Sequence, residues 1–122
     1  MDKWQVLQSF WESFNIPAYD ENTVPDNATM PYITYEAEIG SYNTTLALSA
    51  NIWYLSESWA DISRKAQEIL DFIGESYTSY SITGGYLYIP KNNITMQRLR
   101  DDSNPLIRRI LIQYSAEYYT KT

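Results

Sequence analysis

The sequence predicts a single α+β domain in which two helices cover one face of a largely antiparallel or mixed sheet of about five strands. Three observations lead to this prediction. Two segments repeat apolar residues at helical spacing, several others alternate as strands do, and short polar or glycine-containing turns join most of the strand-like segments. A chain of 122 residues has room for one hydrophobic core, so the predicted domain spans residues 1–122. The expected order is helix, strand, strand, helix, strand, strand, strand.

The first helix is predicted over residues 2–14. Aromatic and apolar residues recur there at helical spacing while polar residues fill the other positions, which is typical of an amphipathic helix. The expected buried stripe comprises Trp4, Leu7, Trp11 and Phe14. Residues 15–29 contain two prolines and several Asp and Asn residues, and they are predicted to form a loop.

The next two segments predict an antiparallel hairpin. Residues 31–39 and 44–55 both alternate in character, and the short polar segment 40–43 separates them. The expected inward residues are Ile33, Tyr35, Ala37 and Ile39 on the first strand, and Leu46, Leu48, Ala50, Ile52 and Tyr54 on the second. Trp53 and Leu55 then fall on the more polar side of the second strand.

A second helix is predicted after an N-cap at Ser56 or Ser58. Its apolar residues repeat at helical spacing, and Gly74 is expected to end it. The expected buried stripe comprises Trp59, Ile62, Ala66, Ile69 and Ile73.

The last third predicts three more strands. Residues 77–82 and 86–89 flank Thr83-Gly84-Gly85, a hairpin signal because glycine adopts the positive φ that tight turns need. Residues 90–105 are polar and predict a long loop. Residues 106–119 alternate again, with Leu111 and Tyr119 on the more polar side of the strand.

Composition argues against several classes of function. The net charge is −6, with nine Lys and Arg against fifteen Asp and Glu, whereas a protein that grips nucleic acid by its phosphates presents a basic face. No run approaches the roughly 18 apolar residues of a membrane span, and the N-terminus lacks a signal-peptide pattern. We therefore expect a cytoplasmic protein without a membrane partner.

The residue types also argue against catalysis. Histidine and cysteine are both absent, which removes the usual proton shuttle and the most reactive nucleophile. Acidic neighbours could in principle act as acid and base: Glu36 with Glu38, Asp20 with Glu21, and Asp101 with Asp102. Each pair is more simply a solvated face or a turn, and no defined calcium or phosphate loop is present. The sequence therefore predicts no enzyme activity, cofactor or metal site.

Twelve tyrosines and four tryptophans indicate either contact with other proteins or simply good strand formers. Trp53, Leu55, Leu111 and Tyr119 are candidate interface anchors because they lie on the more polar side of their strands; alternatively, they tuck under the long loops. Arg98 and Arg100, beside two aspartates, would suit ion pairing across a subunit boundary.

Several stretches resemble the small tail-completion or tail-terminator proteins of long-tailed phages and prophages. They are residues 4–11 (WQVLQSFW), 17–20 (PAYD), 30–35 (MPYITY), 52–54 (IWY) and 58–59 (SW). Size, acidity and element order fit the same family, and the resemblance covers nearly the whole chain. It implies an assembly role, in the host cytoplasm and then in the virion tail.

Members of this family form a ring, commonly hexameric, that caps the tail tube and joins it to the head. The resemblance implies self-association, tail tube and neck proteins as partners, and DNA only as passing cargo. An acidic lumen would keep DNA from sticking, and the candidate lumen residues are Glu36, Glu38, Asp101 and Asp102. The alternatives are a monomeric protein-binding module, a neck or head-closure protein, and a carboxylate-dependent enzyme.

Overall fold

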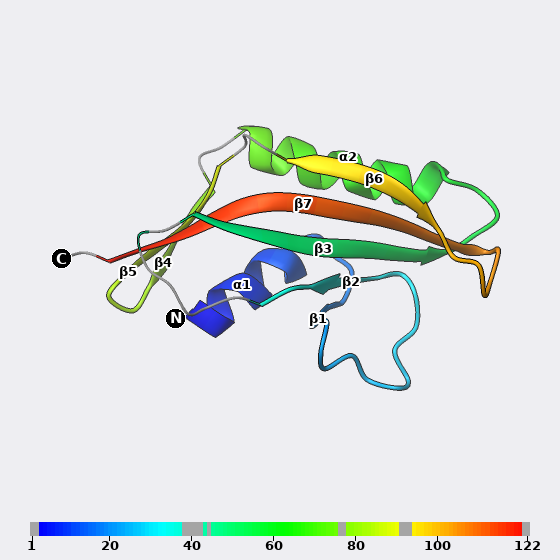
Figure 1. The fold of residues 1–122 in the computed structure, drawn as a ribbon, viewed down its shortest axis with the longest axis horizontal. Coiled ribbons are helices and arrows are strands. Elements are labelled where there is room, and N and C mark those ends of the chain that lie inside the picture. Colours follow the sequence, from blue (N-terminus) through cyan, green and yellow to red (C-terminus); the bar gives the residue numbers. More distant parts are fainter. Residues whose placement is uncertain (1–2, 38–42, 44, 76–77, 91–93, 121–122) are drawn as a thin grey trace.

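The protein is described here from a computed structural model that covers residues 3–37, 43, 45–75, 78–90 and 94–120. This part of the chain forms two helices and a mixed, curled sheet, so the α+β prediction is confirmed. Figure 1 shows two long strands running side by side through the molecule, with the other elements arranged around them. The elements are α1 (Lys3–Glu12), β1 (Ala18–Asp20), β2 (Tyr32–Tyr35), β3 (Thr45–Leu55), α2 (Ala60–Glu75), β4 (Thr78–Ile82), β5 (Gly85–Ile89), β6 (Thr95–Arg100) and β7 (Ile107–Thr120).

Strand β7 is the centre of the sheet. The strand order is β1-β2-β3-β7-β5-β4, and β6 also pairs with β7. One edge of β7 pairs with β3 over residues 107–117, whereas the other edge pairs first with β6, over residues 108–113, and then with β5, over residues 117–120. All these pairings are antiparallel, and β1 with β2 is parallel. Strand β7 therefore pairs with three other strands.

Both helices cover the same face of the sheet, as predicted. The buried side chains of β3 and β7 lie on one face, where Ile52 pairs with Ile110 and Trp11 of α1 meets Tyr114 edge to face at 5.5 Å. The helices also touch each other, because the ring centroids of Phe14 and Phe72 are 5.4 Å apart. One continuous core therefore lies between the helices and this face.

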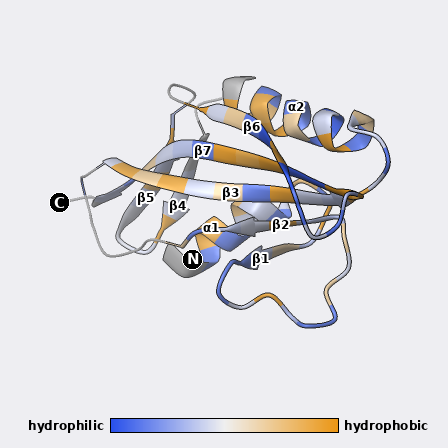
Figure 2. Ribbon diagram, turned by 45° about the vertical axis from the view of Figure 1, so that its right-hand side comes forward, coloured by the Kyte–Doolittle hydropathy of each residue, from blue (hydrophilic) through white to orange (hydrophobic). Residues whose placement is uncertain are grey.

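Each helix buries an apolar stripe of the predicted kind. In α1 the buried residues are Val6, Leu7, Phe10 and Trp11, followed by Phe14 just beyond its end, while the side chain of Trp4 lies outside the described part. In α2 they are Ile62, Ala66, Ile69 and Ile73, and Figure 2 shows hydrophobic and hydrophilic residues alternating around that helix. The predicted cap is present, since the Ser58 hydroxyl accepts a hydrogen bond from the Ala60 N–H at 3.0 Å. Helix α2 continues through Glu75, one residue past the predicted end at Gly74.

The sheet has more strands than the five expected. Strand β1 lies within the predicted loop 15–29, and β6 lies within the predicted loop 90–105. Strand β1, of three residues, is too short to show a period. Each face of β6 has a single apolar residue among polar or charged ones, Met96 on one and Leu99 on the other, so neither face gives an apolar repeat. Strand β2 is also shorter than the predicted segment 31–39, whose Ile39 lies outside the described residues.

The two predicted hairpins that flank α2 in the sequence are present. Strands β2 and β3 pair antiparallel, with Tyr35 opposite Ala50, and β4 pairs with β5 across a two-residue turn at Thr83-Gly84. Gly84 has a φ of 81°, in the left-handed region that favours glycine. Most of the predicted turn at 40–43 lies outside the described residues.

The buried ring of Phe14, just beyond the end of α1, should contribute far more to stability than the Phe72 ring of α2 that it contacts. Phe14 is 2% exposed, so Phe14→Ala should lower the free energy of unfolding by about 3–5 kcal/mol. Phe72, its partner ring, is 39% exposed, and Phe72→Ala should cost only about 1 kcal/mol. Urea unfolding followed by circular dichroism measures both. Equal losses for the two variants would contradict this account of the core.

Stability should fall at alkaline pH because buried tyrosines resist ionisation. Burial, with Asp20 and Glu12 nearby, raises the pKa of Tyr35 to about 12 from an ordinary 10.0. Above pH 10 the unfolded chain releases this proton before the folded chain does, so the stabilisation is lost as pH rises towards 12. Urea unfolding at stepped pH should show a shallower fall for Tyr35→Phe than for wild type. Tyr86→Phe, at an exposed site, is the control, and an equal slope for wild type and Tyr35→Phe would contradict the prediction.

Candidate functional site

The face of the sheet opposite the helices carries an aromatic and apolar group of side chains across four strands. We call it the open sheet face and define it by Tyr32, Thr34, Asn51, Trp53, Leu55, Leu99, Arg109 and Leu111. Strand register places these residues in rows, because residues opposite one another share a face. One row runs from Tyr32 through Trp53 and Arg109 to Leu99.

A polar network holds Trp53 in one orientation. Its indole N–H donates to the Thr34 hydroxyl at 3.0 Å, and the guanidinium carbon of Arg109 lies 5.0 Å from the centroid of its ring. Arg109 Nε in turn donates to the side-chain oxygen of Asn51 at 2.8 Å, and Asn51 is only 8% exposed. The ring is therefore half-buried and fixed rather than loosely placed on the surface.

The four interface candidates lie on this side of the sheet, but they do not form one cluster. Trp53 and Leu111 are half-buried near the centre of the open sheet face, and Leu55 is 57% exposed at the end of β3. Tyr119 lies near the other end of β7, where its ring stacks on Tyr86 at 5.0 Å between centroids. The first three are thus candidates for one surface and Tyr119 for another.

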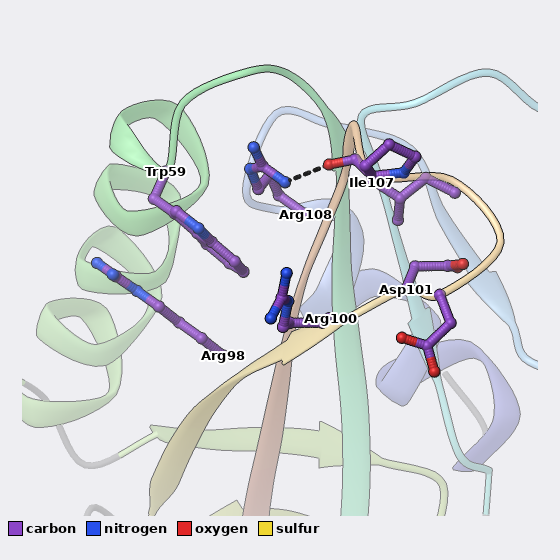
Figure 3. A pocket seen from close by; sticks show the side chains of 8 residues that line it. Trp59, Arg98, Arg100, Asp101, Ile107 and Arg108 are labelled. Atoms are coloured by element: carbon purple, nitrogen blue, oxygen red, sulfur yellow. Dashed lines mark hydrogen bonds between the residues drawn. The ribbon is translucent and has the colours of Figure 1, made fainter.

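A cavity of about 590 Å³ opens on the helix-covered face of the sheet, where α2 begins. We call it the arginine pocket, and Figure 3 shows three arginine side chains from two neighbouring strands entering it beside Trp59. The pocket is lined by Trp59, Arg98, Arg100, Asp101, Asp102, Pro105, Ile107 and Arg108. It therefore brings together Arg98 and Arg100, which the sequence predicted as a pair for ionic contacts.

Contacts with the rest of the fold hold two of the three arginines. The guanidinium carbons of Arg98 and Arg108 lie 5.1 Å and 5.3 Å from the centroid of the Trp59 ring. Arg98 also donates to the Ser63 hydroxyl at 3.1 Å. Arg108 donates to the backbone oxygens of Pro105 at 2.6 Å and Glu57 at 2.9 Å.

The lumen candidates do not gather in one place. Asp101 Oδ1 accepts hydrogen bonds from the backbone and hydroxyl of Ser103, and these hold the pKa of the Asp101 carboxyl below its ordinary value. Asp102 is exposed beside it, whereas Glu36 lies after β2, where it accepts a hydrogen bond from the Ser49 N–H at 3.1 Å. Glu38 lies outside the described residues.

The sequence pattern does not predict that Trp59 and Arg108 belong to the arginine pocket. Helical spacing predicts Trp59 in the buried stripe of the second helix, yet its ring faces two cations at the start of α2. Arg108 lies two residues before the buried Ile110 and so shares the inward face of β7. Arg98 and Arg100 are two residues apart, and this spacing indicates that they share one face if the segment is a strand.

Metal sites and membrane spans are two other features that the structure bears on. Among the described residues, no group of three or more His, Cys, Asp or Glu side chains lies close enough together to hold a metal ion. None of the described helices has the length and apolar character that a membrane span requires. Comparison with known protein families and with curated protein sequences gave no match to this chain.

The Trp59 ring should stabilise the arginine pocket. We expect Trp59→Leu to lower the free energy of unfolding by about 1–2 kcal/mol, because two cation–π contacts are lost. Trp59→Phe keeps a ring and should lose less. Urea unfolding at low and high salt measures the effect, and an equal loss in the two variants would contradict a role for the cations.

Proposed function

We propose that the protein is a non-catalytic assembly protein of a long-tailed phage or prophage, of the kind that caps the tail tube and joins it to the head. The observation that carries the proposal is the open sheet face, an ordered aromatic surface that neither helix covers. The resemblance of the sequence to tail-completion proteins supports this specific role. The proposed partners are further copies of the chain, tail tube protein and neck protein.

The open sheet face has the composition of a protein contact surface. Interfaces are enriched in Trp, Tyr and Arg, and these residue types occupy neighbouring positions in the row Tyr32, Trp53 and Arg109. Trp53 is already ordered by its hydrogen bond to Thr34, so little side-chain conformational entropy would be lost when a partner buries it. Leu55 adds an exposed apolar group at the rim of the same surface.

The negative charge of the chain supports a ring through which DNA passes without being bound. With a net charge of −6, a ring of copies would repel the phosphates of DNA that slides through it. Asp102 is exposed and could line such a lumen, and Glu36, Glu38 and Asp101 remain the other candidates. Virion localisation belongs to this same proposal.

A single exposed leucine tests the surface with little risk to the fold. We expect Leu55→Asp to weaken binding to tail tubes or neck protein encoded in the same genome by about tenfold or more, because it places a charge in an apolar contact. Co-sedimentation with assembled tubes and electron microscopy of tube ends measure binding. Circular dichroism should show an unchanged fold.

The matched control is Leu70→Asp, on α2 and thus on the other side of the sheet, at a residue that is also exposed. It should leave binding unchanged. Equal effects of the two substitutions would remove the open sheet face as the contact surface. Failure of the wild-type protein to bind tubes, neck protein or itself would overturn the proposed function.

A further inference from the structure

The arginine pocket concentrates positive charge that the described fold does not neutralise. Arg100 and Arg108 are directly opposite each other in the β6–β7 ladder, and Arg98 lies two residues away on the same face. Like charges placed directly opposite on paired strands destabilise a sheet. Among the described residues the ion pairs are Arg64 with Asp61 and Lys65 with Glu68, so none reaches the pocket. Three cations without an ion pair among the described residues make this pocket locally positive in an acidic chain.

Neither Asp101 nor Asp102, which also line the pocket, forms an ion pair with these arginines among the described residues. Asp101 follows Arg100 directly and its carboxylate is engaged by Ser103 and Asn104 in its own turn. The one arginine that helps to lower the pKa of Asp101 is Arg109, which lies on the other face of the sheet. Figure 3 shows Asp101 on the loop side of the pocket, apart from the three guanidinium groups.

Two of the cations are in place before any ligand arrives. The Trp59 ring contacts both Arg98 and Arg108. Arg98 also donates to Ser63, and Arg108 donates to the backbone oxygens of Pro105 and Glu57, which lowers the cost of ordering both around an anion. The Nε of Arg108 is buried and has no hydrogen-bond partner among the described residues. Arg100 is exposed and has no hydrogen bond or ion pair in the described part, so its guanidinium is free to turn towards a ligand.

We propose that the arginine pocket binds a compact phosphate group, free or carried as an ester by a small molecule. Guanidinium groups present paired donors that match phosphate oxygens, and three cations offset the two negative charges of a phosphate dianion. The volume of about 590 Å³ lies in the range of small-molecule sites. The acidic residues at the rim and the net charge of −6 disfavour a long polyanion such as DNA. This inference holds whether or not the protein assembles into a tail.

Calorimetric titration of the full chain tests the site. The probes are inorganic phosphate, pyrophosphate and glycerol phosphate, each added at constant ionic strength set with sodium chloride. We expect binding of at least one of the three in wild type and weakening by about tenfold or more in Arg100→Gln, because one charged donor is lost. The order of the three affinities distinguishes free phosphate from an ester as the natural form.

Arg64→Gln is the matched control, because Arg64 is an exposed arginine on α2 that already pairs with Asp61. It makes the same change in net charge and should leave binding within about twofold of wild type. In phosphate-free buffer Arg100→Gln should melt at the same temperature as wild type or higher, because it relieves repulsion from Arg108. A loss of binding then reflects the site and not the fold.

Three outcomes would overturn the proposal. The first is that none of the three phosphates binds at millimolar concentration. The second is equal weakening in Arg100→Gln and Arg64→Gln, which would indicate general attraction to charge. The third is that duplex DNA binds more tightly than any of the three small phosphates, which would identify the wrong class of ligand.

Discussion

Eleven consecutive residue pairs join β3 to β7, from Thr45 opposite Glu117 to Leu55 opposite Ile107. Because successive side chains of a strand point to opposite faces, this ladder decides which residues meet the helices and which meet solvent. A shift of one strand by a single residue would put Trp53 on the face of Arg108 and remove its contact with Arg109. Both candidate sites therefore depend on this register.

The second edge of β7 determines where the arginine pocket lies. Strand β5 occupies the end of that edge near Tyr119, which leaves the start of β7 free to pair with β6. Strand β6 then lies beside the first turns of α2, where Arg98 reaches both Trp59 and Ser63. The position of the pocket thus follows from the way β5 and β6 share the second edge of β7.

Sequence patterns predicted the parts of this fold that bury apolar side chains. The stripe of α2, the ladder of alternating residues in β3 and β7 and the Gly84 turn all follow from local spacing. Strand β6 escaped prediction because its inward residues, after Met96, are Arg98 and Arg100, which face a cavity and not the core. Backbone pairing with β7 holds it in the sheet, and no local pattern shows such a partner.

The same reasoning explains how much of the candidate sites could be found in advance. Trp53, Leu55 and Leu111 were identifiable because an apolar residue on the polar side of a strand is visible in the sequence alone. The arginine pocket was not, because its residues come from the segment just before α2, from β6, from the connection after β6 and from β7, and they meet only in the folded chain. Arg98 and Arg100 were predicted to work together, but in ionic contact between subunits and not in a cavity with Arg108.

Arg108 and Arg109 are consecutive in the chain, yet each lies over a different tryptophan. Arg109 contacts Trp53 on the open sheet face, and Arg108 contacts Trp59 on the helix-covered face, because neighbouring residues of β7 point in opposite directions. The two surfaces are therefore separated by the thickness of the sheet. A protein partner bound across Trp53 and an anion bound beside Trp59 would thus contact opposite faces of the sheet.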